Sequence, residues 1–80
     1  MHELYIKKVS ELIELNGSLI EVKRAIGYLD PAYQARRLEQ LDQKINKLAI
    51  EIFELLEERD KYKKNIPLSE TIQYLVTRLM

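Results

Sequence analysis

The stretch Gly27-Tyr28-Leu29-Asp30-Pro31 divides the chain into two long segments and decides its fold. Glycine readily ends a helix, because it adopts the left-handed backbone conformation that closes the last turn. Asp30 can accept the free amide hydrogens at the start of a following helix, and Pro31 suits the first helical position, where its missing N–H is not needed. The stretch therefore predicts a tight turn between a helix that ends near residue 28 and another that begins at residue 31.

The segment before the turn, residues 3–28, has the apolar periodicity of an amphipathic helix. Its apolar side chains fall at the a and d positions of a heptad repeat, which is typical of helices that pack as in coiled coils. Asn16-Gly17-Ser18 is a turn signal within this segment, but the heptad phase continues across it, and one interior glycine costs only about 1 kcal/mol against alanine. We therefore expect one continuous helix. Its a/d stripe consists of Leu12, Leu15, Leu19, Val22, Ile26 and Leu29.

The segment after the turn, residues 31–65, carries a second and longer heptad series. It has no Gly and no further Pro before Pro67, so we expect one unbroken helix that ends just before that proline. Two helices joined by a few residues fold back antiparallel. Counting outward from the turn then brings apolar positions face to face, which supports the hairpin. The facing residues are Val22 with Leu38, Leu19 with Leu41, Leu15 with Ile45 and Leu12 with Leu48.

A third, short helix is expected over residues 69–79, with Ser69 as its N-cap. Its apolar residues recur on one helical face and are Ile72, Leu75, Val76 and Leu79. A helix of this length is marginal by itself in water, so it must dock on other protein surface. The sequence thus predicts a single all-α domain over residues 1–80, built as a coiled-coil-like antiparallel hairpin with a short C-terminal helix.

Some apolar side chains remain outside the a/d stripes of the hairpin. They are Ile6, Val9, Ile13 and Ile20 on the first helix, and Phe53 and Leu56 near the open end of the second. The tail could fold back over them in a monomeric three-helix bundle, or two copies could join their stripes. The stripe from Ile6 to Ile20 is about 21 Å long and the apolar face of the tail only about 10 Å. Because the tail cannot cover the whole stripe, we expect a helical bundle formed by dimerisation, as a homodimer.

The composition argues against catalysis and metal binding. The chain has no Cys and a single His, His2, so no thiolate or histidine metal site is expected. It also lacks the glycine-rich motifs that bind phosphate. A group of glutamates lacks the histidine partners of a di-iron bundle and is expected on a solvated face: Glu51, Glu54, Glu57 and Glu58. We expect no cofactor, no metal ion and no catalytic residue.

The run Leu55-Leu56-Glu57-Glu58-Arg59, within residues 45–62, resembles the end of the first helix of the helical chorismate mutases. That resemblance implies an enzyme that binds a dicarboxylate substrate. At the two upstream positions where the family carries Arg and Asp, this chain has Asp42 and Ala49. Without that guanidinium the substrate loses a bidentate anchor that other side chains do not replace. We therefore do not expect the chain to be an enzyme.

The charges of the chain balance, with 13 Lys and Arg against 13 Asp and Glu, so no strong field favours nucleic acid or a membrane surface. Basic residues cluster beside the turn, namely Lys23, Arg24, Arg36 and Arg37. We expect acidic neighbours to pair with most of them, which makes nucleic-acid binding the less favoured alternative. Neither a membrane-spanning run nor a leader is evident, so a cytoplasmic location is expected. The composition suits a bacterial or bacteriophage accessory protein.

The sequence predicts a small non-enzymatic protein–protein interaction module, such as an adaptor, regulator or inhibitor, that acts through helical apolar surface. Arg59 and Tyr62 occupy a/d positions beyond the reach of the first helix, and Arg and Tyr are enriched in binding hot spots. The expected partners are a second copy and another protein, with a structural oligomer subunit as a further alternative. The expected partner-binding residues are Ile6, Val9, Ile13, Phe53, Leu56, Arg59, Tyr62, Ile72, Leu75, Val76 and Leu79.

Overall fold

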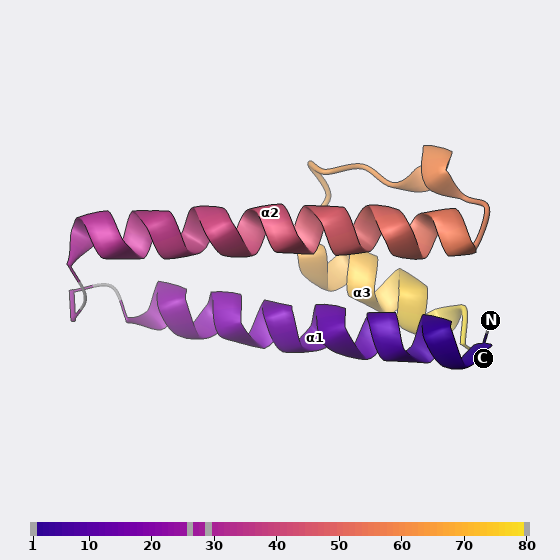
Figure 1. Ribbon diagram of the computed structural model, residues 1–80, viewed down its shortest axis with the longest axis horizontal. Coiled ribbons are helices and arrows are strands. Elements are labelled where there is room, and N and C mark those ends of the chain that lie inside the picture. The colour runs from indigo at the N-terminus through magenta and orange to yellow at the C-terminus, as the bar shows by residue number, and fades with distance from the viewer. Residues whose placement is uncertain (1, 26, 29, 80) are drawn as a thin grey trace.

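The computed structural model describes residues 2–25, 27–28 and 30–79. Three α-helices follow one another, α1 (His2–Arg24), α2 (Pro31–Leu55) and α3 (Leu68–Thr77), with a 3₁₀ turn at Arg59–Lys61 between the last two. None of the described residues lies in a strand. Figure 1 shows α1 and α2 side by side and antiparallel, with α3 against the half of this pair that lies away from the turn. The prediction of an all-α chain is confirmed, and the packing of its helices is that of a bundle.

The start of α2 forms as the sequence predicts. The side chain of Asp30 is the N-cap, and its Oδ2 accepts a hydrogen bond from the backbone N–H of Tyr33 at 3.1 Å. Pro31 follows as the first helical residue. The side chain of Gln34 then reaches across the turn and donates to the backbone oxygen of Val22 at 2.9 Å, which ties the two helices together at this end.

α1 runs unbroken through Asn16-Gly17-Ser18, as the heptad phase predicted. It ends at Arg24 and not near residue 28, because Gly27 has a φ of +94°, a left-handed conformation that a right-handed helix cannot contain. Ile26 and Leu29, which the sequence analysis placed in the a/d stripe, lie outside the described residues.

Replacing Gly17 by Ala is expected to stabilise the chain by about 1 kcal/mol, the difference in helix propensity between these residues. The gain should be realised because a Cβ added at Gly17 meets no atom within 4 Å. Urea unfolding followed by circular dichroism measures the change. Gly27→Ala is the control, and it should lose stability because of the positive φ at that position. Equal effects of the two substitutions would contradict this explanation.

α2 ends at Leu55 and not near residue 65 as the sequence led us to expect. Glu57 adopts the left-handed conformation with a φ of +58°. The N–H of Glu58 then bonds to the oxygen of Phe53 at 2.8 Å, and the N–H of Glu57 to the oxygen of Glu54 at 3.0 Å. These two bonds form a Schellman motif, which usually has Gly where this chain has Glu57.

Packing explains why α2 stops so early. A straight continuation to residue 65 would extend about 15 Å beyond the observed end and would carry Tyr62 away from Phe53 and Asn46. The chain instead turns back, and Figure 1 shows the segment after the 3₁₀ turn running along α2. There the centre of the Tyr62 ring lies 5.4 Å from the centre of the Phe53 ring, and the hydroxyl of Tyr62 donates to Oδ1 of Asn46 at 2.7 Å.

Glu57→Gly is expected to stabilise the chain by about 0.5–1 kcal/mol. The left-handed conformation costs an L-residue about 1–2 kcal/mol, and the greater freedom of glycine in the unfolded chain takes back part of the gain. Thermal unfolding monitored by circular dichroism measures the shift. Glu57→Ala removes the same charge but keeps a Cβ, so it should give no comparable gain; a gain as large as that of glycine would point to the charge instead.

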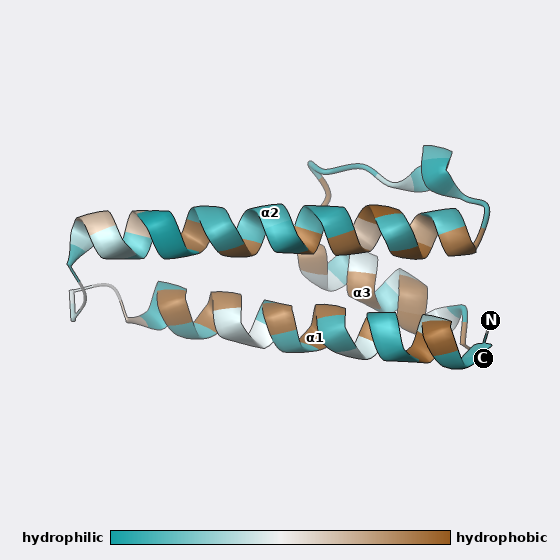
Figure 2. Ribbon diagram, viewed as in Figure 1, coloured by the Kyte–Doolittle hydropathy of each residue, from teal (hydrophilic) through white to brown (hydrophobic). Residues whose placement is uncertain are grey.

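α3 begins at Leu68, with Pro67 and not Ser69 at the N-cap position. It packs on α1 of its own chain, and the ring of Tyr74 stacks on that of Phe53 at 5.8 Å, which joins it to α2. Figure 2 shows apolar positions of α1 and α2 gathered on the sides that face each other. The buried core is formed by Tyr5, Val9, Leu12, Ile45, Leu48, Ile52, Phe53 and Leu75.

Of the helices in the described part of the chain, none has both the length and the hydropathy needed to cross a lipid bilayer.

Candidate functional site

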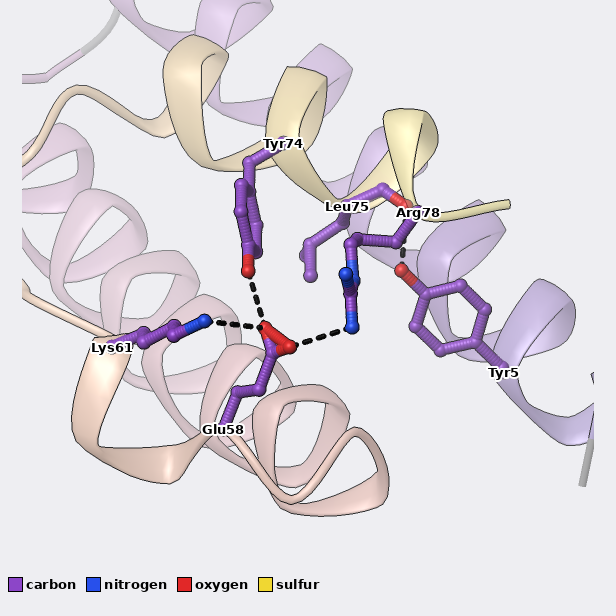
Figure 3. A network of polar contacts seen from close by, with 6 residues as sticks. All are labelled: Tyr5, Glu58, Lys61, Tyr74, Leu75 and Arg78. Carbon is purple, nitrogen blue, oxygen red and sulfur yellow. Dashed lines mark hydrogen bonds and ion pairs between the residues drawn. The ribbon is translucent and has the colours of Figure 1, made fainter. Parts of the chain in front are cut away.

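A largely buried carboxylate, that of Glu58, holds the end of α3 near the end of α2 (Figure 3). Only 8% of Glu58 is exposed. Its oxygens accept a hydrogen bond from the hydroxyl of Tyr74 and another from Nη2 of Arg78 at 2.7 Å, and Nζ of Lys61 lies 3.8 Å away. A carboxylate withdrawn from water needs such partners. We call Glu58, Lys61, Tyr74 and Arg78 the tail latch.

A second polar contact joins α3 to α1. The hydroxyl of Tyr5 donates to the backbone oxygen of Leu75 at 2.5 Å, as Figure 3 shows. Burial raises the pKa of Tyr5, and the hydrogen bond to Glu58 raises the pKa of Tyr74. Both phenols therefore remain neutral hydrogen-bond donors at neutral pH. Polar contacts thus fix α3 to α1 and to the segment that follows α2, in addition to its apolar packing.

The tail latch engages its polar groups within the chain. Its carboxylate already accepts bonds from a phenol and a guanidinium, so the arrangement serves the stability of the bundle. Within residues 2–25, 27–28 and 30–79, no three His, Cys, Asp or Glu side chains gather as they would around a metal ion. The same residues contain no buried side-chain nitrogen or oxygen without a hydrogen-bond partner.

Acidification is expected to destabilise the bundle through Glu58 and Glu51. The hydrogen bond from Tyr74, with the charge of Arg78, lowers the pKa of Glu58 below its ordinary value of 4.5, and Nζ of Lys8, 2.8 Å from Glu51, lowers the pKa of that residue. Such a carboxylate stabilises the fold above its unfolded pKa and loses this contribution as the pH falls through its folded pKa. The free energy of unfolding, measured in urea at several pH values, should therefore decline below about pH 4.5.

The control for this pH dependence is a pair of substitutions. Glu58→Gln should make the acid decline shallower, whereas Glu54→Gln, at an exposed position of α2, should leave it unchanged. Equal slopes for Glu58→Gln and the unmodified chain would contradict the assignment.

Stability is also expected to fall at alkaline pH. The pKa values of Tyr5 and Tyr74 are raised in the folded chain, so their neutral forms stabilise the fold, and this contribution is lost as the pH rises above about 10.

The structure separates the residues that the sequence assigned to partner binding into three groups. Those buried in the core of the single chain, and so out of reach of a partner in this fold, are Val9, Phe53 and Leu75. Those half-buried against the same core are Leu56, Tyr62, Ile72 and Leu79. Those exposed are Ile6, Ile13, Arg59 and Val76.

Arg59 and Tyr62 do not lie on α2. Arg59 opens the 3₁₀ turn, with its guanidinium 5.9 Å from the centre of the Tyr62 ring, and Tyr62 packs on Phe53. The two residues therefore contact their own chain and do not extend the a/d stripe. The run 55–59 that resembles a chorismate mutase helix is likewise interrupted by the end of α2.

One apolar stripe of α1 stays exposed although α3 is docked. Ile6, Ile13 and Ile20 are 41%, 45% and 40% exposed. Residues seven apart lie almost above one another on a helix, so these three side chains form a line. Exposed Ser10 and Gly17 lie between them, and Arg24 continues the series. We call this set, with its alternating spacing of four and three residues, the outer stripe: Ile6, Ser10, Ile13, Gly17, Ile20 and Arg24.

Four members of the outer stripe were not assigned as site residues from the sequence, namely Ser10, Gly17, Ile20 and Arg24. Gly17 was interpreted only as a turn signal, and Ile20 was recognised as apolar but not assigned to binding. The signal that could have found them is the recurrence of Ile at every seventh position, with a small residue four positions after each of the first two isoleucines. Such spacing is that of a helix-packing surface.

The chain matches no known protein family, curated protein or solved structure at a significant level. The fold by itself places it in the broad class of all-helical bundles.

Proposed function

We propose that this chain is a small non-enzymatic protein-binding module of the cytoplasm, an adaptor, regulator or inhibitor, and that its outer stripe docks an amphipathic helix of a protein partner. The observation that carries this proposal is the line formed by Ile6, Ile13 and Ile20, each at least 40% exposed. Single apolar residues on a surface need no explanation. A row at heptad spacing is the pattern by which one helix receives another.

The shape of the outer stripe supports a helix as its occupant. Gly17 has no Cβ, and one added there would meet no atom within 4 Å, so the space above its backbone is open. Ser10 contributes only a small side chain. Between the isoleucines these positions leave holes into which the side chains of a facing helix can insert.

A photoreactive residue placed at position 13 tests this proposal in the cells that make the protein. Leu4 provides a matched control position, because it is also 45% exposed and, nine residues away, lies about 180° around α1 from Ile13. Protein adducts should form with the probe at position 13 and be scarce with the probe at position 4. With the probe at position 6, the substitution Ile13→Asp should suppress the adducts that form there. Equal labelling at positions 13 and 4 would contradict the proposal.

A second candidate function, nucleic-acid binding, is supported by the basic tip. Tyr33, Arg36, Arg37 and Gln40 line a surface hollow there. None of the ion pairs between described residues involves these arginines, so the pairing expected from the sequence is not seen. If the tip binds phosphates, affinity for DNA or RNA should fall steeply between about 50 and 200 mM salt and be lost in Arg36→Glu. Helix docking on the outer stripe should barely respond to salt.

A further inference from the structure

We infer that the helix received by the outer stripe is α1 of a second copy of this chain, packed antiparallel. This inference rests on the proposed function of the outer stripe as a helix-docking surface and adds the identity of the partner. The sizes of the side chains along the stripe and the charges beside it support this partner.

The sizes of the side chains make the outer stripe complementary to itself in one orientation. Large residues alternate with small ones, and interdigitating layers need a large residue opposite a small one. When two copies of α1 are packed antiparallel, Ile13 of one copy faces Gly17 of the other, and Ile20 faces Ser10. A parallel pair would instead place Ile against Ile in one layer and Gly against Gly in another, which leaves the layers unequal in width.

The contact is closed by symmetry. In the antiparallel arrangement each copy uses the same surface, so a two-fold axis relates them and the assembly stops at a dimer. Ile6 then faces Arg24 of the other copy, whose aliphatic stem can cover it while the guanidinium stays in water.

Charges beside the outer stripe favour the same orientation. Lys7, Glu14 and Glu21 follow the three isoleucines and are all exposed. Across an antiparallel pair, Lys7 of each copy lies beside Glu21 of the other, which gives two opposite-charge contacts. Glu14 of one copy lies beside Glu14 of the other near the two-fold axis, so like charges oppose association there. The same geometry thus predicts one substitution that should strengthen the dimer.

The length of α1 limits how strong this dimer can be. A helix of 23 residues is about 35 Å long, and a single pair of such helices lies at the small end of stable interfaces. Association is therefore expected at roughly micromolar concentrations and above.

Sedimentation equilibrium of the full chain tests the inference across concentrations from about 1 µM to 1 mM. A monomer–dimer equilibrium is expected, with a dissociation constant raised at least about tenfold by Ile13→Asp, unchanged by Leu4→Asp and lowered several-fold by Glu14→Gln. Circular dichroism checks that each variant is folded. A chain that stays monomeric to 1 mM, or one that is weakened equally by Ile13→Asp and Leu4→Asp, overturns the inference.

Disulfide trapping tests the orientation, because the chain has no Cys of its own. An equimolar mixture of the Ser10→Cys and Ile20→Cys variants should form a mixed disulfide rapidly, whereas neither variant should cross-link to itself. In the antiparallel pair, identical positions lie about 15 Å apart, beyond the reach of a disulfide. Rapid Ser10→Cys self-linkage would overturn the antiparallel arrangement.

The failures of the two proposals can be told apart. If the chain is monomeric to 1 mM but the probe at position 13 still labels another protein that the probe at position 4 does not label, the second-copy inference fails and the proposed function stands. If positions 13 and 4 label alike, the proposed function fails whatever the molar mass of the chain.

Discussion

Shortening the chain after Asn65 should remove most of its stability, because this deletes α3. α3 contributes the fully buried Leu75, and its loss uncovers Tyr5 and Phe53, which contact Leu75 and Tyr74 and are 6% and 4% exposed in the intact chain. At about 1.5–3 kcal/mol for each large apolar side chain fully withdrawn from water, the expected loss is about 5 kcal/mol. Small domains are stable by only about 5–15 kcal/mol in total. Residues 1–65 should therefore be largely unfolded or associated at 25 °C.

Urea unfolding and molar mass in solution measure the effect of this truncation. The full chain should unfold cooperatively, whereas residues 1–65 should show no native baseline or should form larger species. Val76→Ala in the full chain is the control, since Val76 is 37% exposed and its truncation should cost under about 1 kcal/mol. If the shortened chain were monomeric and unfolded at the same urea concentration as the full chain, α3 would contribute nothing to stability.

Replacing Phe53 by Ala should cost about 3–5 kcal/mol, as truncation of a buried Phe commonly does. Phe53 is 4% exposed, and its ring contacts those of Tyr62 and Tyr74 at 5.4 and 5.8 Å. The substitution therefore opens a cavity where the chain reversal and α3 both pack. Urea unfolding measures the loss, and Tyr28→Ala, at a residue 89% exposed, should change stability by no more than about 0.5 kcal/mol.

The outcome of this substitution decides between two roles for Phe53. The sequence pattern predicts that Phe53 binds a partner, and the structure places it in the core. A variant of unchanged stability that loses association would restore the binding role. A destabilised variant supports the core role.

The hairpin was predictable because its signals are local. Asp30 and Pro31 start a helix by their own chemistry, and the heptad phase across Gly17 identified one continuous α1. The register also follows from the sequence. The pairing of Leu12 with Leu48 predicts that residues near position 8 face residues near position 51, and Nζ of Lys8 lies 2.8 Å from Oε2 of Glu51.

The end of α2 was not predictable from local signals, because tertiary packing decides it. Glu57 is an unusual residue for a left-handed position, and no Gly or Pro marks the site. The error carried over to Phe53, since a straight α2 would leave that residue at an open end. Only the return of the chain, with Tyr62 on Phe53, turns this surface into core.

The tail latch was hidden for a related reason. Glu58 was expected on a solvated face with its neighbours, and it is buried only because Tyr74 and Arg78 come to it from 16 and 20 residues away. The outer stripe, in contrast, is visible in the sequence. The length of the tail predicts that part of the stripe from Ile6 to Ile20 stays uncovered, and Ile6, Ile13 and Ile20 are 41%, 45% and 40% exposed with α3 docked.

The bond between Tyr5 and Leu75 joins residues 70 positions apart, which has a consequence for synthesis in the cell. At about 5–20 residues per second, roughly 4–14 s pass between the addition of these two residues by the ribosome. Until then Tyr5 lacks its hydrogen-bond acceptor on α3, and Phe53 lacks the stacked ring of Tyr74. Folding is therefore completed only after residue 75 has left the exit tunnel, and a chaperone that shields apolar segments would protect the incompletely folded chain until then.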